Sequence, residues 1–89
     1  MTEISVVPEG SGRFHVVVDE GGSRTEHEVT ASAEDLERLG GGYGSPEAFL
    51  RACFAFLLER EPKESILRSF EVGAIGRYYP EFEATIQRG

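Results

Sequence analysis

The segment from Ser45 to Arg60, SPEAFLRACFAFLLER, constrains the fold more than any other part of the chain. Ser45 is suited to cap a helix with its hydroxyl oxygen, and Pro46 fits the first helical position because its missing N–H is not needed there. Seven apolar side chains follow, and at 100° per residue they cover most of the helix circumference: Phe49, Leu50, Cys53, Phe54, Phe56, Leu57 and Leu58. A helix that is apolar nearly all round packs on more than one side. The sequence therefore predicts a central core helix over 46–60.

The first thirty residues predict a three-stranded antiparallel β-meander. A short strand over 4–7 ends at Pro8, and strands over 13–19 and 24–30 are joined by Gly21-Gly22, which suits a type I′ turn. Pairing across this turn places two residues opposite one another when their numbers add to 43. That register gives one mainly apolar face and one face with opposite-charge pairs, as a half-buried sheet requires.

The remainder of the chain predicts helices. Ser32 and Asp35 form a capping box before a short helix over 33–39, which ends at Gly40. After the central helix we expect three further segments: a helix over 62–70 with Ile66, Leu67 and Phe70 on its buried face, a short helix over 72–79, and a last helical turn over 81–87. The predicted fold class is α+β in a single domain over 1–89, with the meander in 1–30 and a layer of three to four helices in 31–89.

Composition excludes several classes of function. The chain has 89 residues and a net charge of −7, which argues against binding to nucleic acid or to an anionic membrane. The N-terminus has no basic segment followed by a long apolar run, and no window approaches 18 apolar residues, so we expect a cytoplasmic protein with no membrane span. The single cysteine, Cys53, is expected to be a buried hydrophobe in a reducing compartment.

The candidate chemical groups have structural explanations. The register puts His15 and His27 on opposite faces of the hairpin, so they cannot share a metal ion. The glycine run over 40–44 lacks the lysine of a phosphate-binding loop and is better explained as a helix end and hinge. Paired glutamates lie on solvated faces, and the serines are accounted for as helix caps. We therefore expect no catalytic, cofactor-binding or metal-binding residues and no enzymatic activity.

One group of side chains has the composition of an interaction surface. Aromatic residues and arginines, which are enriched at interface hot spots, cluster near the C-terminus. The hypothesised partner contacts are Arg68, Arg77, Tyr78, Tyr79 and Phe82. The competing interpretation is that these rings close the bottom of a small core. The sequence favours a non-enzymatic module that binds a protein partner or a second copy of itself.

A regulatory DNA-binding protein is the alternative function. Residues 64–80 suggest a helix-turn-helix, with two short helices broken near Glu71-Val72. The position where the next apolar anchor is required is Arg77, and Pro80 shortens the would-be recognition helix. Only Arg68, Arg77 and Arg88 are placed to contact phosphates, so nucleic-acid binding is the weaker interpretation.

The segment over 57–83, LLEREPKESILRSFEVGAIGRYYPEFE, resembles the C-terminal part of a small family of uncharacterised bacterial proteins. The matching positions are Glu59, Arg60, Glu61, Pro62, Glu64, Ser65, Ile66, Leu67, Arg68, Phe70, Ile75, Arg77, Tyr78, Pro80 and Glu81. This resemblance implies a strand-rich start followed by helices and implies no activity. The order of three strands and a helix is also similar in topology to antitoxins of the Hic type, without a matching motif.

Overall fold

The first three strands form the predicted antiparallel meander. In the computed structural model, which describes residues 2–87, they are β1 (Thr2–Gly10), β2 (Arg13–Glu20) and β3 (Ser23–Thr30). The pairing of β2 with β3 runs from Arg13 opposite Thr30 to Glu20 opposite Ser23, which confirms the predicted register. Gly21 and Gly22 both have positive φ, as a type I′ turn requires.

β1 is longer than its sequence predicts, because Pro8 does not end it. Pro8 lies opposite Phe14, and the register shifts between Pro8 and Gly10. β1 is an edge strand of the sheet, with β2 as its neighbour. A proline is tolerated at an edge, since an N–H on the outer side would have no partner strand to bond.

A fourth strand completes the sheet and was not predicted. β4 (Ser69–Glu71) pairs in parallel with β3, so that Phe70 lies opposite Val29. The strand order is β1-β2-β3-β4, and the sheet is therefore mixed, with three antiparallel strands and one short parallel strand. The structure is α+β as expected, but the prediction of three strands is incomplete.

The helix starts follow the capping residues. Ser32 accepts a hydrogen bond from the Asp35 N–H at 3.0 Å at the start of α1 (Ala33–Gly40). Ser45 accepts one from the Ala48 N–H at 3.1 Å at the start of α2 (Pro46–Leu58). Both predicted caps are confirmed, and α2 ends two residues before the predicted boundary.

The predicted helix over 62–70 is wrong. This segment begins with a single 3₁₀ turn, η1 (Lys63–Ser65), and then extends into β4. Ile66 is buried, but Leu67 is 52% exposed and does not lie on a buried helix face. A second 3₁₀ turn, η2 (Val72–Ala74), leads into α3 (Ile75–Tyr78), and α4 (Phe82–Gln87) follows, in agreement with the two later helical segments.

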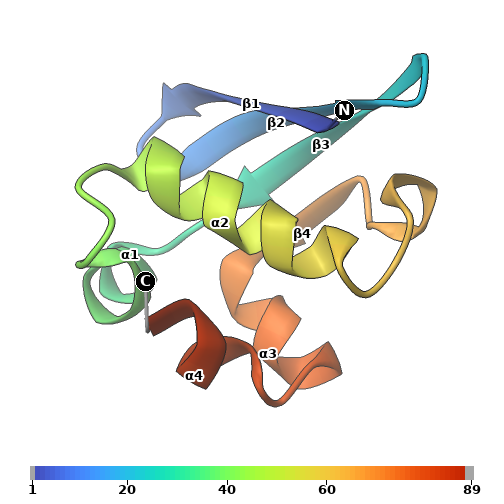
Figure 1. Cartoon of the computed structure of the whole chain (residues 1–89). Helices are drawn as coiled ribbons and strands as arrows, with labels where there is room; N and C mark the ends of the chain where they lie inside the picture. Colours follow the sequence, from blue (N-terminus) through green and yellow to red (C-terminus); the bar gives the residue numbers. More distant parts are fainter. Residues whose placement is uncertain (1, 88–89) are drawn as a thin grey trace.

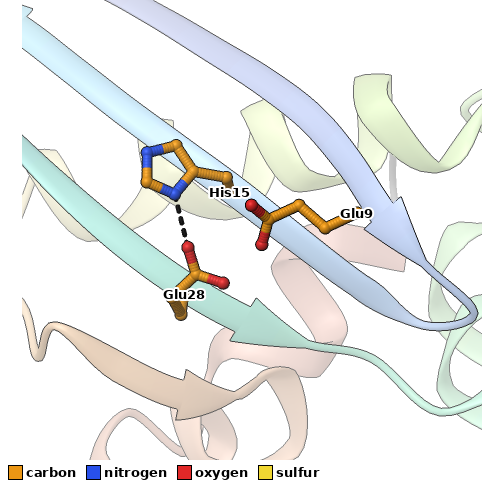
Figure 2. A group of neighbouring side chains, drawn as sticks. All are labelled: Glu9, His15 and Glu28. Carbon is orange, nitrogen blue, oxygen red and sulfur yellow. Dashed lines mark hydrogen bonds and ion pairs between the residues drawn. The ribbon is translucent and has the colours of Figure 1, made fainter.

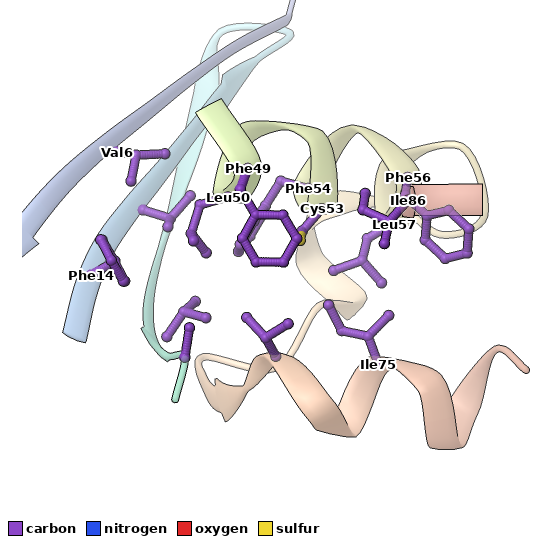
Figure 3. Close-up of a cluster of buried hydrophobic side chains, with 14 of the residues drawn as sticks. Val6, Phe14, Phe49, Leu50, Cys53, Phe54, Phe56, Leu57, Ile75 and Ile86 are labelled. Atoms are coloured by element: carbon purple, nitrogen blue, oxygen red, sulfur yellow. The ribbon is translucent and has the colours of Figure 1, made fainter. Parts of the chain in front are cut away.

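All the α-helices lie on one side of the sheet, and α2 crosses it most closely (Figure 1). Five side chains of α2 are at most 4% exposed: Phe49, Leu50, Cys53, Phe54 and Phe56. Figure 3 shows them beside Val6 and Phe14 of the sheet at one end and near Ile75 and Ile86 at the other. The core helix is thus packed on more than one side, as its apolar circumference predicts.

Candidate functional site

An apolar groove lies where the end of α2 meets η1, β4 and α3. Its volume is about 290 Å³. The residues that line it come from α2, η1, β4, η2 and α3 and from the connections beside them: Leu57, Glu61, Ser65, Ile66, Leu67, Phe70, Ala74, Ile75, Tyr78 and Tyr79. Leu67 and Phe70 line this groove from the extended segment that leads into β4.

The groove carries most of the exposed large apolar side chains. Among residues 2–87, the large hydrophobic residues classed as exposed are Val7 at 55%, Leu67 at 52% and Tyr78 at 69%. Leu67 and Tyr78 both line the groove, whereas Val7 lies on β1. Scattered exposed hydrophobic residues are normal, but two on one groove form a patch of the kind found at binding sites.

One polar pair forms part of the groove wall. The Tyr79 hydroxyl donates a hydrogen bond to the Glu61 carboxylate, with an O–O distance of 2.5 Å. This hydrogen bond raises the pKa of Tyr79 above its usual value, since the phenolate would face a carboxylate. Glu61 is the single charged residue among those that line the groove within the described part of the chain.

The opposite wall is held to the sheet by backbone contacts. The Glu28 N–H donates to the Arg68 carbonyl at 2.7 Å, and the His27 Nδ1 lies 2.8 Å from the Leu67 carbonyl. A carbonyl only accepts hydrogen bonds, so Nδ1 carries the proton and donates. The backbone of this segment is thus hydrogen-bonded to residues of β3 at Leu67 and at Arg68. The exposed Leu67 side chain is therefore carried by a fixed backbone.

The hypothesised partner contacts do not form one surface. Arg68, Arg77 and Tyr78 are exposed, and the Arg77 guanidinium is 3.8 Å from the Glu71 carboxylate. Tyr79 is partly buried and stacks edge-on against Phe56. Phe82 is 1% exposed and packs against Phe56, so its assignment to the surface is wrong. The cluster thus divides into a groove lined by Tyr78 and Tyr79, exposed arginines, and a core residue.

Sequence reasoning missed Leu67 and Glu61 as groove residues. Leu67 is predicted on the buried face of a helix that does not form, and from the sequence Glu61 is named only as a matching position in the family resemblance. The order of polar and apolar residues in this segment carries no signal for parallel pairing with β3, forty residues earlier. The helix pair required for a helix-turn-helix is absent from 64–80, where η1, β4, η2 and α3 lie instead. Arg88, one of the three arginines considered for phosphate contacts, lies outside the described residues.

The two histidines lie on opposite faces of the sheet, as predicted. His27 is 1% exposed on the helix-covered face, and burial lowers its pKa. His15 lies on the open face, where it contacts Glu26 and Glu28. Cys53 is fully buried, and burial raises the pKa of its thiol far above the usual value.

Among residues 2–87, no helix is both long enough and apolar enough to cross a bilayer. Comparison with family models, curated proteins and solved structures found no match for this chain. The resemblance of residues 57–83 to a bacterial family therefore stays a prediction, and a proposal for function rests on the geometry of the site.

Proposed function

We propose that this protein is a non-enzymatic interaction module that binds a segment of a partner protein in the groove between α2, β4 and α3. The observation that carries the proposal is the exposure of Leu67 and Tyr78 on one apolar groove. Exposing both side chains to water is unfavourable by about 25 cal/mol per Å² of apolar area, and a partner that covers them recovers this free energy.

The volume of the groove is suited to a single side chain of a partner protein. A volume of about 290 Å³ lies at the lower limit of the roughly 300–1,000 Å³ that is usual for small-molecule and cofactor pockets. One large apolar side chain of a partner fits such a groove. Hot spots at protein interfaces have this form, with one anchor residue in a desolvated pocket.

The negative charge of the protein favours a partner segment with a basic residue next to the large apolar side chain that enters the groove. Glu61 supplies the charge in the groove wall, and the whole chain has a net charge of −7. A cation next to the anchor pairs with Glu61, and the overall charge increases the association rate of a basic partner. The proposed ligand is therefore a peptide segment with a large apolar residue adjacent to lysine or arginine.

The test selects peptides from a random displayed library on the wild-type protein and measures their affinity for three variants. We expect the selected peptides to share an apolar-basic pair. Leu67→Ser and Tyr78→Ala should each weaken binding at least 30-fold, which corresponds to a hot-spot loss of about 2 kcal/mol. Val7→Ser removes an equally exposed apolar side chain on another face and should change the affinity less than threefold.

Several outcomes would contradict the proposal. Equal loss of affinity in Val7→Ser and Leu67→Ser would show that binding does not use the groove. Concentration-dependent dimerisation that Leu67→Ser abolishes would identify a second copy of the chain as the occupant and overturn the choice of a basic partner segment. Saturable binding to duplex DNA with a steep salt dependence would favour the alternative regulatory function.

A further inference from the structure

The open face of the sheet brings together three side chains that can ligate a metal ion. Glu9, His15 and Glu28 come from β1, β2 and β3 respectively, and Figure 2 shows them converging across the three strands. His15 lies directly opposite Glu28 in the register, and the register shift near Pro8 places Glu9 beside them. One ligand atom from each residue lies within 4.8 Å of the other two.

The imidazole of His15 is oriented as in many metal sites. Its Nε2 lies 3.0 Å from the Glu26 carboxylate, which lies outside the group of three and can only accept a hydrogen bond. Both ring nitrogens therefore donate to carboxylates, Nε2 to Glu26 and Nδ1 to Glu28, and Nδ1 becomes a metal ligand when an ion replaces its proton. A carboxylate on the far nitrogen fixes the tautomer of a ligating histidine in the same way.

A proton on Nδ1 of His15 links the ring to the Glu28 carboxylate, and a divalent ion can take the place of this proton. Nδ1 of His15 and carboxylate oxygens of Glu28 and Glu9 converge on one region at the surface of the sheet. A divalent ion satisfies all three atoms together, and the two carboxylates balance its charge. Because the group lies at the surface, the remaining coordination positions are open to water.

We propose that Glu9, His15 and Glu28 form a binding site for a divalent transition-metal ion of the Zn²⁺ type. One imidazole nitrogen and two carboxylate oxygens suit Zn²⁺, which forms bonds of about 2.0–2.2 Å to such ligands. The nitrogen ligand favours Zn²⁺ over Mg²⁺ and Ca²⁺, which prefer a shell of oxygen atoms. This site is separate from the groove, and the proposal does not depend on the proposed function.

Glu26 acts as a positioning residue in this proposal. It contacts the ring nitrogen that faces away from Glu9 and Glu28, so it orients the ligand and does not bind the ion. Loss of such an outer partner typically weakens metal binding 10- to 100-fold. Arg13 is the nearby positive charge that opposes binding, since it lies close enough to influence both Glu9 and Glu28.

The test is a Zn²⁺ titration of the untagged chain of residues 1–89 at neutral pH, followed by the imidazole signals of its two histidines in an NMR spectrum. We expect saturable shifts of the His15 ring and unchanged signals from the buried His27. Affinity should fall at least 100-fold in His15→Gln and at least tenfold in both Glu28→Gln and Glu26→Gln. Glu3→Gln removes one negative charge from the same strand as Glu9 and should leave the affinity within threefold.

The proposal fails if Zn²⁺ causes no saturable shift of the His15 ring at millimolar concentration. It also fails if Glu3→Gln weakens binding as much as Glu28→Gln, because the ion would then be responding to overall charge. Each variant is first checked for an unchanged thermal unfolding midpoint without metal, and the wild-type ring shifts remain a valid readout if one variant does not fold. Mg²⁺ at the same concentration should leave the His15 signals in place.

Discussion

His27 joins two parts of the sheet that are far apart in the sequence. Its Nδ1 donates to the Leu67 carbonyl, its Nε2 accepts from the Thr25 hydroxyl at 2.9 Å, and its ring packs 5.3 Å from that of Phe54. Both ring nitrogens are thus satisfied in the neutral form. The sequence predicts that His27 lies on the face opposite His15, but its partner, the Leu67 carbonyl, lies just before β4, a strand that was not predicted.

Protonation of His27 should destabilise the protein. Burial, and to a lesser degree the charges of Arg68 and His15, lower the pKa of His27 below its ordinary value of 6.5, while the Leu67 carbonyl acts in the opposite direction. A base with a lowered pKa in the folded state binds protons more readily when unfolded, so stability is lost as pH falls below 6.5. We expect His27→Gln to flatten the decline in unfolding free energy between about pH 7 and pH 5, measured by urea denaturation.

His15 provides a control, because its protonation should have the opposite effect on stability. Hydrogen bonding to Glu28, and further to Glu26, raises the pKa of His15 above 6.5, so its contribution to stability is present in acid and is lost as pH rises. His15→Gln should therefore make the acid decline steeper. Identical pH profiles for the two variants would contradict the assignment of His27 as the buried neutral histidine.

Among the helices and strands, features that depend on neighbouring residues could be predicted from the sequence. Pairing between distant segments could not. The caps at Ser32 and Ser45 and the Gly21-Gly22 turn depend on neighbouring residues, and all of them are confirmed. β4 depends on β3, some forty residues earlier, and Lys63–Ser65 continues only as a 3₁₀ turn because the chain then extends along that strand. Leu67 and Phe70 line the groove from this same segment, and the helix predicted over 62–70 put Leu67 on a buried face, whereas its side chain is 52% exposed.

The turn between β1 and β2 is held against the end of β3 by a glycine. Gly12 has φ of 70°, its carbonyl accepts from the Ala31 N–H at 2.8 Å, and an added Cβ would lie 2.7 Å from the Ala31 carbonyl oxygen. Gly12→Ala should lower the free energy of unfolding by about 2 kcal/mol or more, since left-handed backbone alone is unfavourable by about 1–2 kcal/mol for a side-chain-bearing residue. Chemical denaturation measures this directly.

Gly42 is the matched control for that substitution. It has no atom within 4 Å of an added Cβ and no positive φ, so alanine fits its position. Gly42→Ala should leave stability unchanged or raise it by up to about 1 kcal/mol through the unfolded state. An equal loss of stability in both variants would show that the contact with Ala31 is not what requires glycine at position 12.

Across the whole molecule, the two sides of the sheet have different roles. The helices cover one face, where the core lies between them and the sheet, while the open face carries charged side chains, among them Glu9, His15 and Glu28 (Figures 1 and 2). The groove opens among the segments after α2, where the chain leaves the central helix and returns to the sheet. The proposed partner site and the proposed metal site are thus built by different elements and can be tested separately.

The central claim is that partner segments bind in the groove, and methyl-resolved NMR tests it most directly. The tightest peptide from the displayed library is titrated into protein labelled at the methyl groups of leucine, isoleucine and valine. We predict saturable shifts at Leu67 and Ile75, which line the groove, and unchanged signals at Val7 on β1. Shifts centred on Val7, with Leu67 and Ile75 unaffected, would contradict the account.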